Sequence, residues 1–311
     1  MDEFGLIARY FAPLAKDAGA LGLKDDAAFI PPRPGFDLVI TTDQIAADTD
    51  FFPHDPPTTV AKKALRVNLS DLAAKGAKPE FYLLNLALPR SMHEDWLAAF
   101  AQGLAQDQQQ FGISLLGGDT SATEGALSIS ATAFGFVPQG RMVKRNGAKV
   151  GDAVYVTGTI GDSAGGLAIF KREQHRLDDA ARDYLTGRYQ VPEPPVAFGA
   201  QHLGELASAA IDVSDGLIAD LGHIAEASKV RIALDGEAVP RSDALRAFWG
   251  DGVGAIVRAT TAGDDYQIAF TGQPGLHGPF TRIGLVQAGE GVAVAVDGKP
   301  VAVPRPGYRH F

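Results

Sequence analysis

The 311-residue sequence predicts a mixed α/β protein built from two α/β subdomains. Its length is above the size at which a single hydrophobic core usually gives way to two. Segments with the period of a strand alternate with segments with the period of a helix in both halves, which is typical of α/β folds. A glycine-rich, basic stretch over 139–152 lies between the halves. We therefore expect an N-terminal subdomain over residues 1–140 and a C-terminal subdomain over residues 150–311.

The first half is expected to begin with a helix over 4–16, because its apolar residues recur at helical spacing. A strand over 37–43 follows. A loop with three prolines then leads into a helix over 59–75, which stops at Gly76. The remaining elements expected here are strands at 81–88, 113–116 and 126–137 and a helix at 93–110.

The second half is expected to open with a strand over 153–157 and a glycine-rich turn. Three prolines between 192 and 195 interrupt the helical region that follows. A strand over 208–213 then leads into a helix over 216–228. The other expected elements are helices around 163–171 and up to about 190, and strands at 255–260, 266–271, 281–286 and 292–296.

The composition excludes several classes of function. Acidic residues outnumber basic ones by 37 to 28, and a net charge of -9 argues against nonspecific binding to nucleic acid or membranes. The absence of cysteine excludes disulfides, thiolate metal sites and cysteine nucleophiles. No signal peptide or membrane-spanning run is visible, so we expect a cytoplasmic protein.

Aspartates occur at four places where apolar runs or predicted strands end. Asp26 follows Asp25 between small and apolar residues, and Asp43 ends the first strand after Thr41 and Thr42. Any one of these acids is more often a helix cap or a turn residue. Together their oxygens are the hard ligands that suit Mg²⁺. The other two groups are Gly117-Gly118-Asp119-Thr120 and Asp212-Val213-Ser214-Asp215-Gly216.

Asp71 lies on the otherwise apolar stripe of the predicted 59–75 helix. A carboxylate that faces a core needs a cation or hydrogen-bond donors. Lys75, one turn later, could pair with it. A metal shared with the other acids could also satisfy it, and the pattern leaves both interpretations open.

One motif points to a different chemistry. Gly161-Asp162-Ser163-Ala164-Gly165 matches the G-x-S-x-G elbow of serine hydrolases and lies between a strand and a helix. Four residues separate it from the strand core, and no histidine-glycine run upstream supplies an oxyanion hole. A hydrolase using Ser163 is therefore a minor alternative. P-loop, kinase-type and H-E-x-x-H motifs do not occur.

Seven short motifs occur in order along nearly the whole chain. In combination they resemble the thiamine-monophosphate kinase family, which belongs to the superfamily of aminoimidazole ribonucleotide synthetase, selenophosphate synthetase and a hydrogenase maturation factor. The last two usually act through a cysteine or selenocysteine, which this chain lacks. The motifs are Lys24-Asp25-Asp26-Ala27-Ala28, Thr41-Thr42-Asp43, the run from Ala64 to Ala74, Gly117-Gly118-Asp119-Thr120, Tyr155-Val156-Thr157-Gly158, the run from Ile211 to Leu217, and the closing run from Gly307 to Phe311.

The resemblance implies a Mg²⁺-dependent transfer of the ATP γ-phosphoryl group to thiamine monophosphate, giving thiamine diphosphate. The acceptor phosphate is already ionised near neutral pH, since its second pKa is about 6. No general base is then required. The enzyme must instead align two polyanions and screen their repulsion, as in other phosphoryl transfers.

The resemblance also implies roles for individual residues. Asp71 and Asp119 would bridge Mg²⁺, and Gly118, Asp119, Arg145 and Ser214 would contact ATP. Asp264 and Tyr308 would contact the acceptor. The implied metal ligands are Asp26, Thr41, Thr42, Asp43, Asp71, Asp119, Asp212 and Asp215. The implied architecture has an N-terminal subdomain that binds ATP and Mg²⁺ and pairs its sheet in a homodimer, and a C-terminal subdomain that completes the site.

Two positions depart from the family pattern, and both concern the acceptor. Asp50 stands where the family usually has a substrate-contacting histidine, with His54 close by. Asp264 stands where the family has a glutamate. The alternative is therefore an enzyme with the same ATP chemistry and a different small acceptor.

Overall fold

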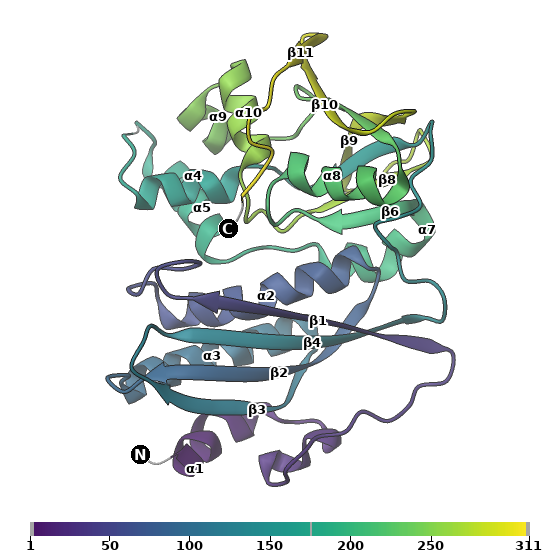
Figure 1. Ribbon diagram of the computed structural model, residues 1–311. Coiled ribbons are helices and arrows are strands. Elements are labelled where there is room, and N and C mark those ends of the chain that lie inside the picture. Colours follow the sequence, from purple (N-terminus) through teal and green to yellow (C-terminus); the bar gives the residue numbers. More distant parts are fainter. Residues whose placement is uncertain (1–2, 175, 309–311) are drawn as a thin grey trace. The chain divides into compact units, whose positions relative to one another are not determined.

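The structure is a computed structural model, and it describes residues 3–174 and 176–308. The chain divides into two compact units. The first consists of Met1–Leu72 and Ala77–Met142, and the second of Ala73–Gly76 and Val143–Phe311. Each unit combines a sheet with helices (Figure 1), which confirms the predicted mixed α/β class.

The first unit is a four-stranded sheet in the order β1-β4-β2-β3. β4 is antiparallel to both of its neighbours, whereas β2 and β3 are parallel. The helices α2 and α3 cover one face of the sheet (Figure 1). The elements are α1 (Glu3–Leu6), η1 (Ile7–Phe11), η2 (Ala12–Leu14), η3 (Ala18–Leu23), β1 (Phe36–Ala46), α2 (Pro57–Ala74), β2 (Lys78–Pro89), α3 (Glu94–Phe111), β3 (Ser114–Thr123) and β4 (Ser128–Pro138).

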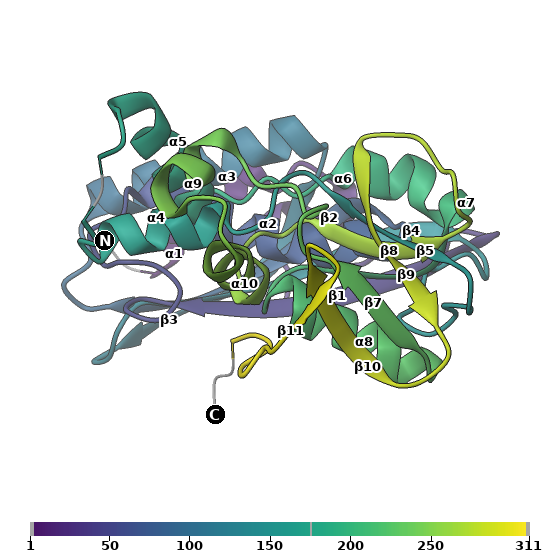
Figure 2. The same cartoon turned by 90° about the horizontal axis from the view of Figure 1, so that it is seen from above.

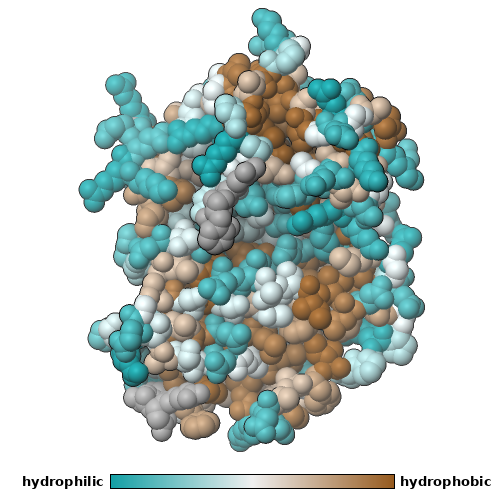
Figure 3. Space-filling view, viewed as in Figure 1, coloured by the Kyte–Doolittle hydropathy of each residue, from teal (hydrophilic) through white to brown (hydrophobic). Residues whose placement is uncertain are grey.

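The two faces of this sheet differ in burial. Val39 on β1 packs with Leu72 of α2 in the core, whereas Leu38 and Ile40 on the other face are exposed. This alternation follows from the two-residue period of a strand. Figure 3 shows apolar side chains on the uncovered face, over β1 and β4.

The second unit is a seven-stranded sheet in the order β11-β10-β7-β9-β5-β8-β6. α8 lies alongside β10 and β7 (Figure 2), and its buried face joins the main core of this unit. The strands are β5 (Ala153–Thr157), β6 (Ala207–Asp212), β7 (Arg231–Asp235), β8 (Ile268–Gly272), β9 (Phe280–Gln287), β10 (Gly291–Val296) and β11 (Lys299–Val301). The helices are α4 (Asp162–Phe170), α5 (Asp179–Gln190), α6 (Val196–Phe198), η4 (Gly199–Leu203), α7 (Gly204–Leu206), α8 (Leu217–Ser228), α9 (Asp243–Trp249) and α10 (Val253–Thr261).

The short segment Ala73–Gly76 at the end of α2 belongs to the second unit. Lys75 Nζ donates a hydrogen bond to the carbonyl oxygen of Ala210, 2.8 Å away. A Cβ atom at Gly199 would lie 2.3 Å from the carbonyl oxygen of Ala73, so only glycine allows this close approach.

Several elements differ from the sequence-based expectation. β1 and β3 extend beyond the predicted 37–43 and 113–116, so Asp43 and Asp119 lie within strands and do not end them. The predicted strand at 255–260 is wrong, since α10 occupies these residues. Its buried residues, Ala255, Ile256, Ala259 and Thr260, recur at helical spacing despite the β-branched composition.

No helix in the described residues is both long enough and apolar enough to cross a membrane.

Candidate functional site

The first group of candidate residues lies between β1 and α2. Thr41 and Asp43 share the face of β1 that α2 covers, because they are two residues apart in a strand. The hydroxyl of Thr41 donates a short hydrogen bond to the carboxylate of Asp71 on α2. The structure therefore brings Thr41, Asp43 and Asp71 together, as their predicted common role requires.

Burial and acidic neighbours shift the pKa of Asp43. Its burial, followed by the charges of Asp71 and Asp50, raises its pKa to about 6. Several carboxylates close together favour protonation unless a cation compensates them. A bound divalent ion would supply that compensation and reverse the shift.

Asp50 belongs to the same acidic group. Its carboxylate accepts a hydrogen bond of 2.8 Å from the backbone N–H of Ala46, which closes the turn after β1. The ammonium group of Lys63 donates to its carbonyl oxygen at 2.7 Å. His54 packs its ring against Phe52, with centroids 5.5 Å apart. Asp50, predicted to face the acceptor, is thus held near Asp43.

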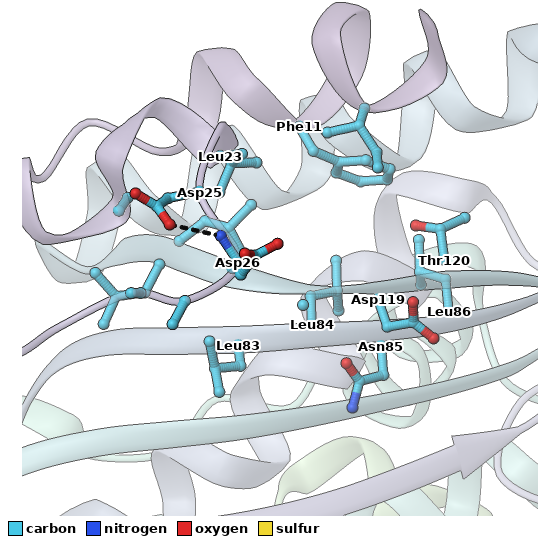
Figure 4. Close-up of a pocket in the computed structure, with 18 of the residues that line it drawn as sticks. Phe11, Leu23, Asp25, Asp26, Leu83, Leu84, Asn85, Leu86, Asp119 and Thr120 are labelled. Carbon is cyan, nitrogen blue, oxygen red and sulfur yellow. Dashed lines mark hydrogen bonds between the residues drawn. The ribbon is translucent and has the colours of Figure 1, made fainter. Parts of the chain in front are cut away.

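A second group lines a pocket of about 710 Å³ in the first unit (Figure 4). Asp26 enters it from the loop after η3, and Gly118 and Asp119 enter it from β3. The backbone N–H of Asp26 donates to Asp25 Oδ1 at 2.8 Å. Asp119 lies beside its cross-strand neighbour Asn85. Much of the remaining lining is apolar, including Phe11, Leu23, Leu83, Leu86 and Phe134.

Gly118 is required by the contact between β3 and β2. A Cβ atom there would lie 1.8 Å from the carbonyl oxygen of Leu84, and the φ angle is +153°. Only glycine allows the two backbones to approach so closely.

The sheet separates these two groups. The registers place Gln44, Ser130, Asn85 and Asp119 in one row across the four strands, on the face opposite Asp43. Three strand spacings amount to about 14 Å. Thr42 also lies on that opposite face, where its hydroxyl accepts a 3.0 Å hydrogen bond from Thr132. In one chain, Asp119 and Thr42 are therefore not side-chain neighbours of Asp43 and Asp71.

Within residues 3–174 and 176–308, no three histidine, cysteine, aspartate or glutamate side chains are arranged to hold one metal ion. Seven of the eight implied ligands instead fall into the two groups above and a third group in the second unit, whereas Thr42 lies beside Thr132 outside these groups.

This third group is the loop that links β6 to α8. Asp212 ends β6 and is buried, and Ser214 and Asp215 follow in the loop. The carboxylate of Asp220, on the first turn of α8, accepts hydrogen bonds from the N–H groups of Ser214, Asp215 and Gly216 at 3.1, 3.2 and 3.1 Å. It fixes the loop that carries the candidate ligands.

Burial, followed by the charge of Asp215, raises the pKa of Asp220 to about 7, although its three backbone hydrogen bonds lower it. Sequence reasoning missed this residue. Its position four residues after Gly216, on the first turn of a helix, is a capping signal that could have identified it.

Asp264 and Tyr308 are predicted to contact the substrate that accepts the phosphoryl group. Both contact this loop through their backbones. The N–H of Asp264 donates to the carbonyl of Ser214 at 2.8 Å, and that of Tyr308 donates to the carbonyl of Asp215 at 2.9 Å. A Cβ atom at Gly263 would lie 2.3 Å from the carbonyl oxygen of Ser214, so the segments are in tight contact. The second unit thus brings Ser214, Asp215, Asp264 and Tyr308 together.

Asp264 and Tyr266 have φ angles of 69° and 51°, in the left-handed region that non-glycine residues rarely adopt. Each such residue costs of the order of 1 kcal/mol or more and persists only where its surroundings enforce it. The N–H of Tyr266 donates to the carbonyl of Val213 at 2.8 Å, and its hydroxyl donates to Asp264 Oδ1 at 3.2 Å.

Two further candidates remain. Arg145 is exposed, and its carbonyl oxygen accepts a 3.3 Å hydrogen bond from Ser228. Ser163 is 1% exposed, and within the described part of the chain its hydroxyl has no hydrogen-bond partner. A hydrolase nucleophile needs an accessible hydroxyl beside a base, so the geometry does not favour the hydrolase alternative.

Comparisons with known proteins agree with this division into two units. Residues 24–137 match the family model of the AIR synthase related protein, N-terminal domain, and residues 149–297 match that of its C-terminal domain. The chain is 42% identical to the thiamine-monophosphate kinase of Salmonella typhimurium, over 99% of this chain and 98% of the relative. It is 32% identical to that of Bacillus subtilis, with both chains covered completely.

Solved structures give the same result. The thiamine-monophosphate kinase from Stenotrophomonas maltophilia superposes with a TM-score of 0.85 and 39% identity, covering 97% of this chain and 98% of the other. AaThiL complexed with AMPPCP and TMP superposes with a TM-score of 0.81 and 33% identity, covering 99% of this chain and 97% of the other. The hydrogenase maturation protein HypE in complex with ATP, at 18% identity and a TM-score of 0.75 over 97% and 94%, shares the fold. On the identity and coverage of these relatives, the chain belongs to the thiamine-monophosphate kinase family.

Proposed function

We propose that this protein transfers the γ-phosphoryl group of ATP to thiamine monophosphate and so forms thiamine diphosphate. The observation that carries the proposal is the acidic group of Asp43, Asp71 and Asp50, in which burial, followed by the charges of Asp71 and Asp50, raises the pKa of Asp43 to about 6. Divalent cations that bind such a group offset the repulsion between its carboxylates and favour their ionised form. Membership in the family supplies the substrates.

The donor set fits Mg²⁺, because every implied ligand side chain provides oxygen. Asp26, Thr41, Thr42, Asp43, Asp71, Asp119, Asp212 and Asp215 are proposed to hold several ions. Bound there, Mg²⁺ supplies charge neutralisation for the phosphates. Thr41 orients the Asp71 carboxylate by its hydrogen bond, and Asp220 orients the loop of Asp212 and Asp215.

The pocket of the first unit is a suitable site for the nucleotide. It combines an apolar lining with Asp26, Gly118 and Asp119. Ligand sites are usually apolar with a few precisely positioned polar groups, and this combination suits the nucleobase and the phosphates of a nucleotide. Arg145 and Ser214 are proposed as further ATP contacts.

Asp50, Asp264 and Tyr308 are proposed to contact the acceptor. Tyr308 is 50% exposed and offers an aromatic face, whereas Asp264 offers a negative charge. A cationic aromatic ring such as that of thiamine is attracted to both groups. The chain's residues thus position the ionised acceptor phosphate, and the mechanism needs no side chain to remove a proton.

We further propose a homodimer in which the uncovered faces of two β1-β4-β2-β3 sheets meet. Phe36, Leu38 and Ile40 are 45%, 44% and 56% exposed on β1, and exposed apolar patches mark interaction surfaces. In that arrangement the first unit serves nucleotide binding and dimerisation, and the second completes the site. We expect the enzyme in the cytoplasm.

The test incubates the purified protein with ATP, Mg²⁺ and thiamine monophosphate and measures thiamine diphosphate by chromatography. We expect product that disappears when a chelator removes Mg²⁺. ATP consumption without thiamine diphosphate, or phosphorylation of another small acceptor, would contradict the acceptor assignment.

Asp71→Asn tests the metal site within this assay. We expect turnover to fall by at least about 100-fold with the fold intact, because one bridging charge is lost. Asp95→Asn, an exposed acid on α3, is the matched control and should retain full activity. Near-normal activity of Asp71→Asn would remove Asp71 from the site.

A further inference from the structure

Asp265 is a buried acid that the proposed mechanism does not use. It is 1% exposed, although it lies between Asp264 and Tyr266, which remain partly accessible. Its side chain therefore points into the second unit, whereas its neighbours lie at the loop that links β6 to α8.

The carboxyl of Asp265 connects this segment to the beginning of α4. Its Oδ2 atom accepts a 2.7 Å hydrogen bond from the N–H of Gly161, and the carboxyl also accepts one from the N–H of Ser163. These N–H groups belong to the end of a helix that has no side-chain cap of its own. The acid thus caps α4 from a position about 100 residues away in the chain.

The anchor lies between two strained residues. Asp264 and Tyr266, immediately before and after Asp265, both have positive φ angles. Two backbone hydrogen bonds hold them against Ser214 and Val213, and the Tyr266 hydroxyl contacts the Asp264 carboxylate. Strain of this kind persists only where the surroundings enforce it, and the side chain of Asp265 is the interior attachment of the segment.

The attachment is also costly. Within the part of the chain described, Asp265 Oδ1 has no hydrogen-bond partner. Burial raises the pKa of its carboxyl well above the ordinary value. A buried polar atom without a partner destabilises a fold, so its presence calls for a reason other than stability.

We propose that Asp265 is a positioning residue that holds Asp264, and with it Tyr266, in the orientation needed to bind the phosphate-bearing acceptor. The inference rests on the proposed function. In this proposal, the contact between Asp265 and the N-terminus of α4 holds the segment from its buried side, and Asp264 and Tyr266 bind the acceptor from its accessible side.

The experiment compares Asp265→Ala, Asp265→Asn and Asp178→Ala in steady-state assays in which the acceptor and ATP are varied separately. Asp178 is the matched control, because it is also an aspartate that caps a helix: it caps α5 by accepting from the N–H of Ala181 at 2.8 Å. Folding of each variant is checked by circular dichroism and thermal melting.

We expect Asp265→Ala to raise the KM for thiamine monophosphate by about 10- to 100-fold and to change the KM for ATP by less than about two-fold. Asp265→Asn keeps an oxygen that accepts from Gly161, so it should restore the acceptor KM to within about three-fold of the original. Asp178→Ala should lower the melting temperature and leave both KM values unchanged.

Tyr266→Phe keeps the test decisive if Asp265→Ala does not fold. It removes only the hydroxyl that contacts Asp264, and we expect the acceptor KM to rise by roughly three-fold or more. A folded Asp265→Ala with an unchanged acceptor KM, or with both KM values raised in parallel, would overturn the inference, as would an unchanged acceptor KM in Tyr266→Phe. If the unaltered protein makes no thiamine diphosphate, the proposed function fails instead, and the two failures are thereby distinguished.

Discussion

Asp43 lies half-buried beside Asp71 and Asp50, and its raised pKa has a consequence for stability. Between its unfolded pKa of about 4 and its folded pKa of about 6, the folded chain binds more protons than the unfolded one. The stabilisation from this group is therefore complete below about pH 4 and is lost as the pH rises through 6. At neutral pH, without metal, Asp43 destabilises the fold.

Asp43→Asn is expected to raise the free energy of unfolding of the Mg²⁺-free protein at pH 7.5 by about 2 kcal/mol. The gain should disappear below about pH 4, where the aspartate is itself protonated. Urea denaturation in the presence of a chelator, across this pH range, measures the effect. The same variant should lose most of its activity, since a metal ligand is removed.

Asp37→Asn provides the control on the same strand. Asp37 lies on the same face of β1 and accepts a 2.7 Å hydrogen bond from the N–H of Gly140. It should give no such gain. A Mg²⁺-free Asp43→Asn that is less stable than the original protein at pH 7.5 would contradict the electrostatic explanation.

Asp220 acts through hydrogen bonds. Asp220→Ala removes the acceptor for three N–H groups, so we expect a loss of about 2–3 kcal/mol in unfolding free energy and weaker Mg²⁺ binding. Calorimetric titration with Mg²⁺ measures the second effect. Glu226→Ala, at an exposed position later on the same helix, should change neither quantity. Unchanged Mg²⁺ affinity in a folded Asp220→Ala would show that the loop keeps its shape without this acid.

At the scale of elements, the pairing of β2 with β3 depends on one glycine. Gly118→Ala would place a methyl group 1.8 Å from the carbonyl oxygen of Leu84. We expect it to destabilise the protein by about 3 kcal/mol or more and to abolish activity, since the strands must separate where Asp119 lies. Gly117→Ala is the matched control, because its Cβ atom would meet only Leu83 Cδ2, at 3.4 Å.

Thermal melting of the two glycine variants measures this difference. Equal melting temperatures for Gly117→Ala and Gly118→Ala would show that β3 adjusts to the added methyl group.

Most elements could be predicted from sequence because their apolar residues repeat with a clear period. The predicted strand ended at Asp43, after the polar run from Thr41 to Asp43, whereas β1 continues to Ala46. Hydrogen bonds to β4 continue the strand there, and only the sheet reveals them. At 255–260, β-branched residues favoured a strand, whereas the spacing of Ala255, Ile256 and Ala259 fits the observed helix.

The candidate site follows a similar division. Motifs and the family resemblance made Asp43, Asp71, Asp215 and Asp264 candidates, because these residues carry side-chain chemistry. Asp265 was not assigned a role, because its partners are backbone N–H groups distant in the chain, and no residue pattern marks them. The motif also grouped Thr41 with Thr42, whereas the sheet places their side chains on opposite faces, Thr41 beside Asp71 and Thr42 beside Thr132.

At the scale of the whole molecule, the proposed dimer depends on the apolar half of β1. Ile40→Lys should convert a dimer into a monomer, because a charge would be buried in the joined sheet faces. Light scattering after gel filtration measures the mass. Val253→Lys, at a similarly exposed position on α10, should leave the mass unchanged. A monomeric unaltered protein, or a dimeric Ile40→Lys, would contradict the proposal.

The segment Ala73–Gly76 restricts where the chain can be cut into fragments that each contain a complete unit. A fragment that starts at Val143 would lack residues that contribute a lysine hydrogen bond to Ala210 and a backbone surface for Gly199. The second unit is therefore discontinuous, and during synthesis the segment Ala73–Gly76, made about seventy residues before the rest of the unit begins, must wait for that rest before it can pack. In a chimera whose C-terminal half comes from a relative, the interior of the second unit will be complete only if the same relative also provides the end of α2.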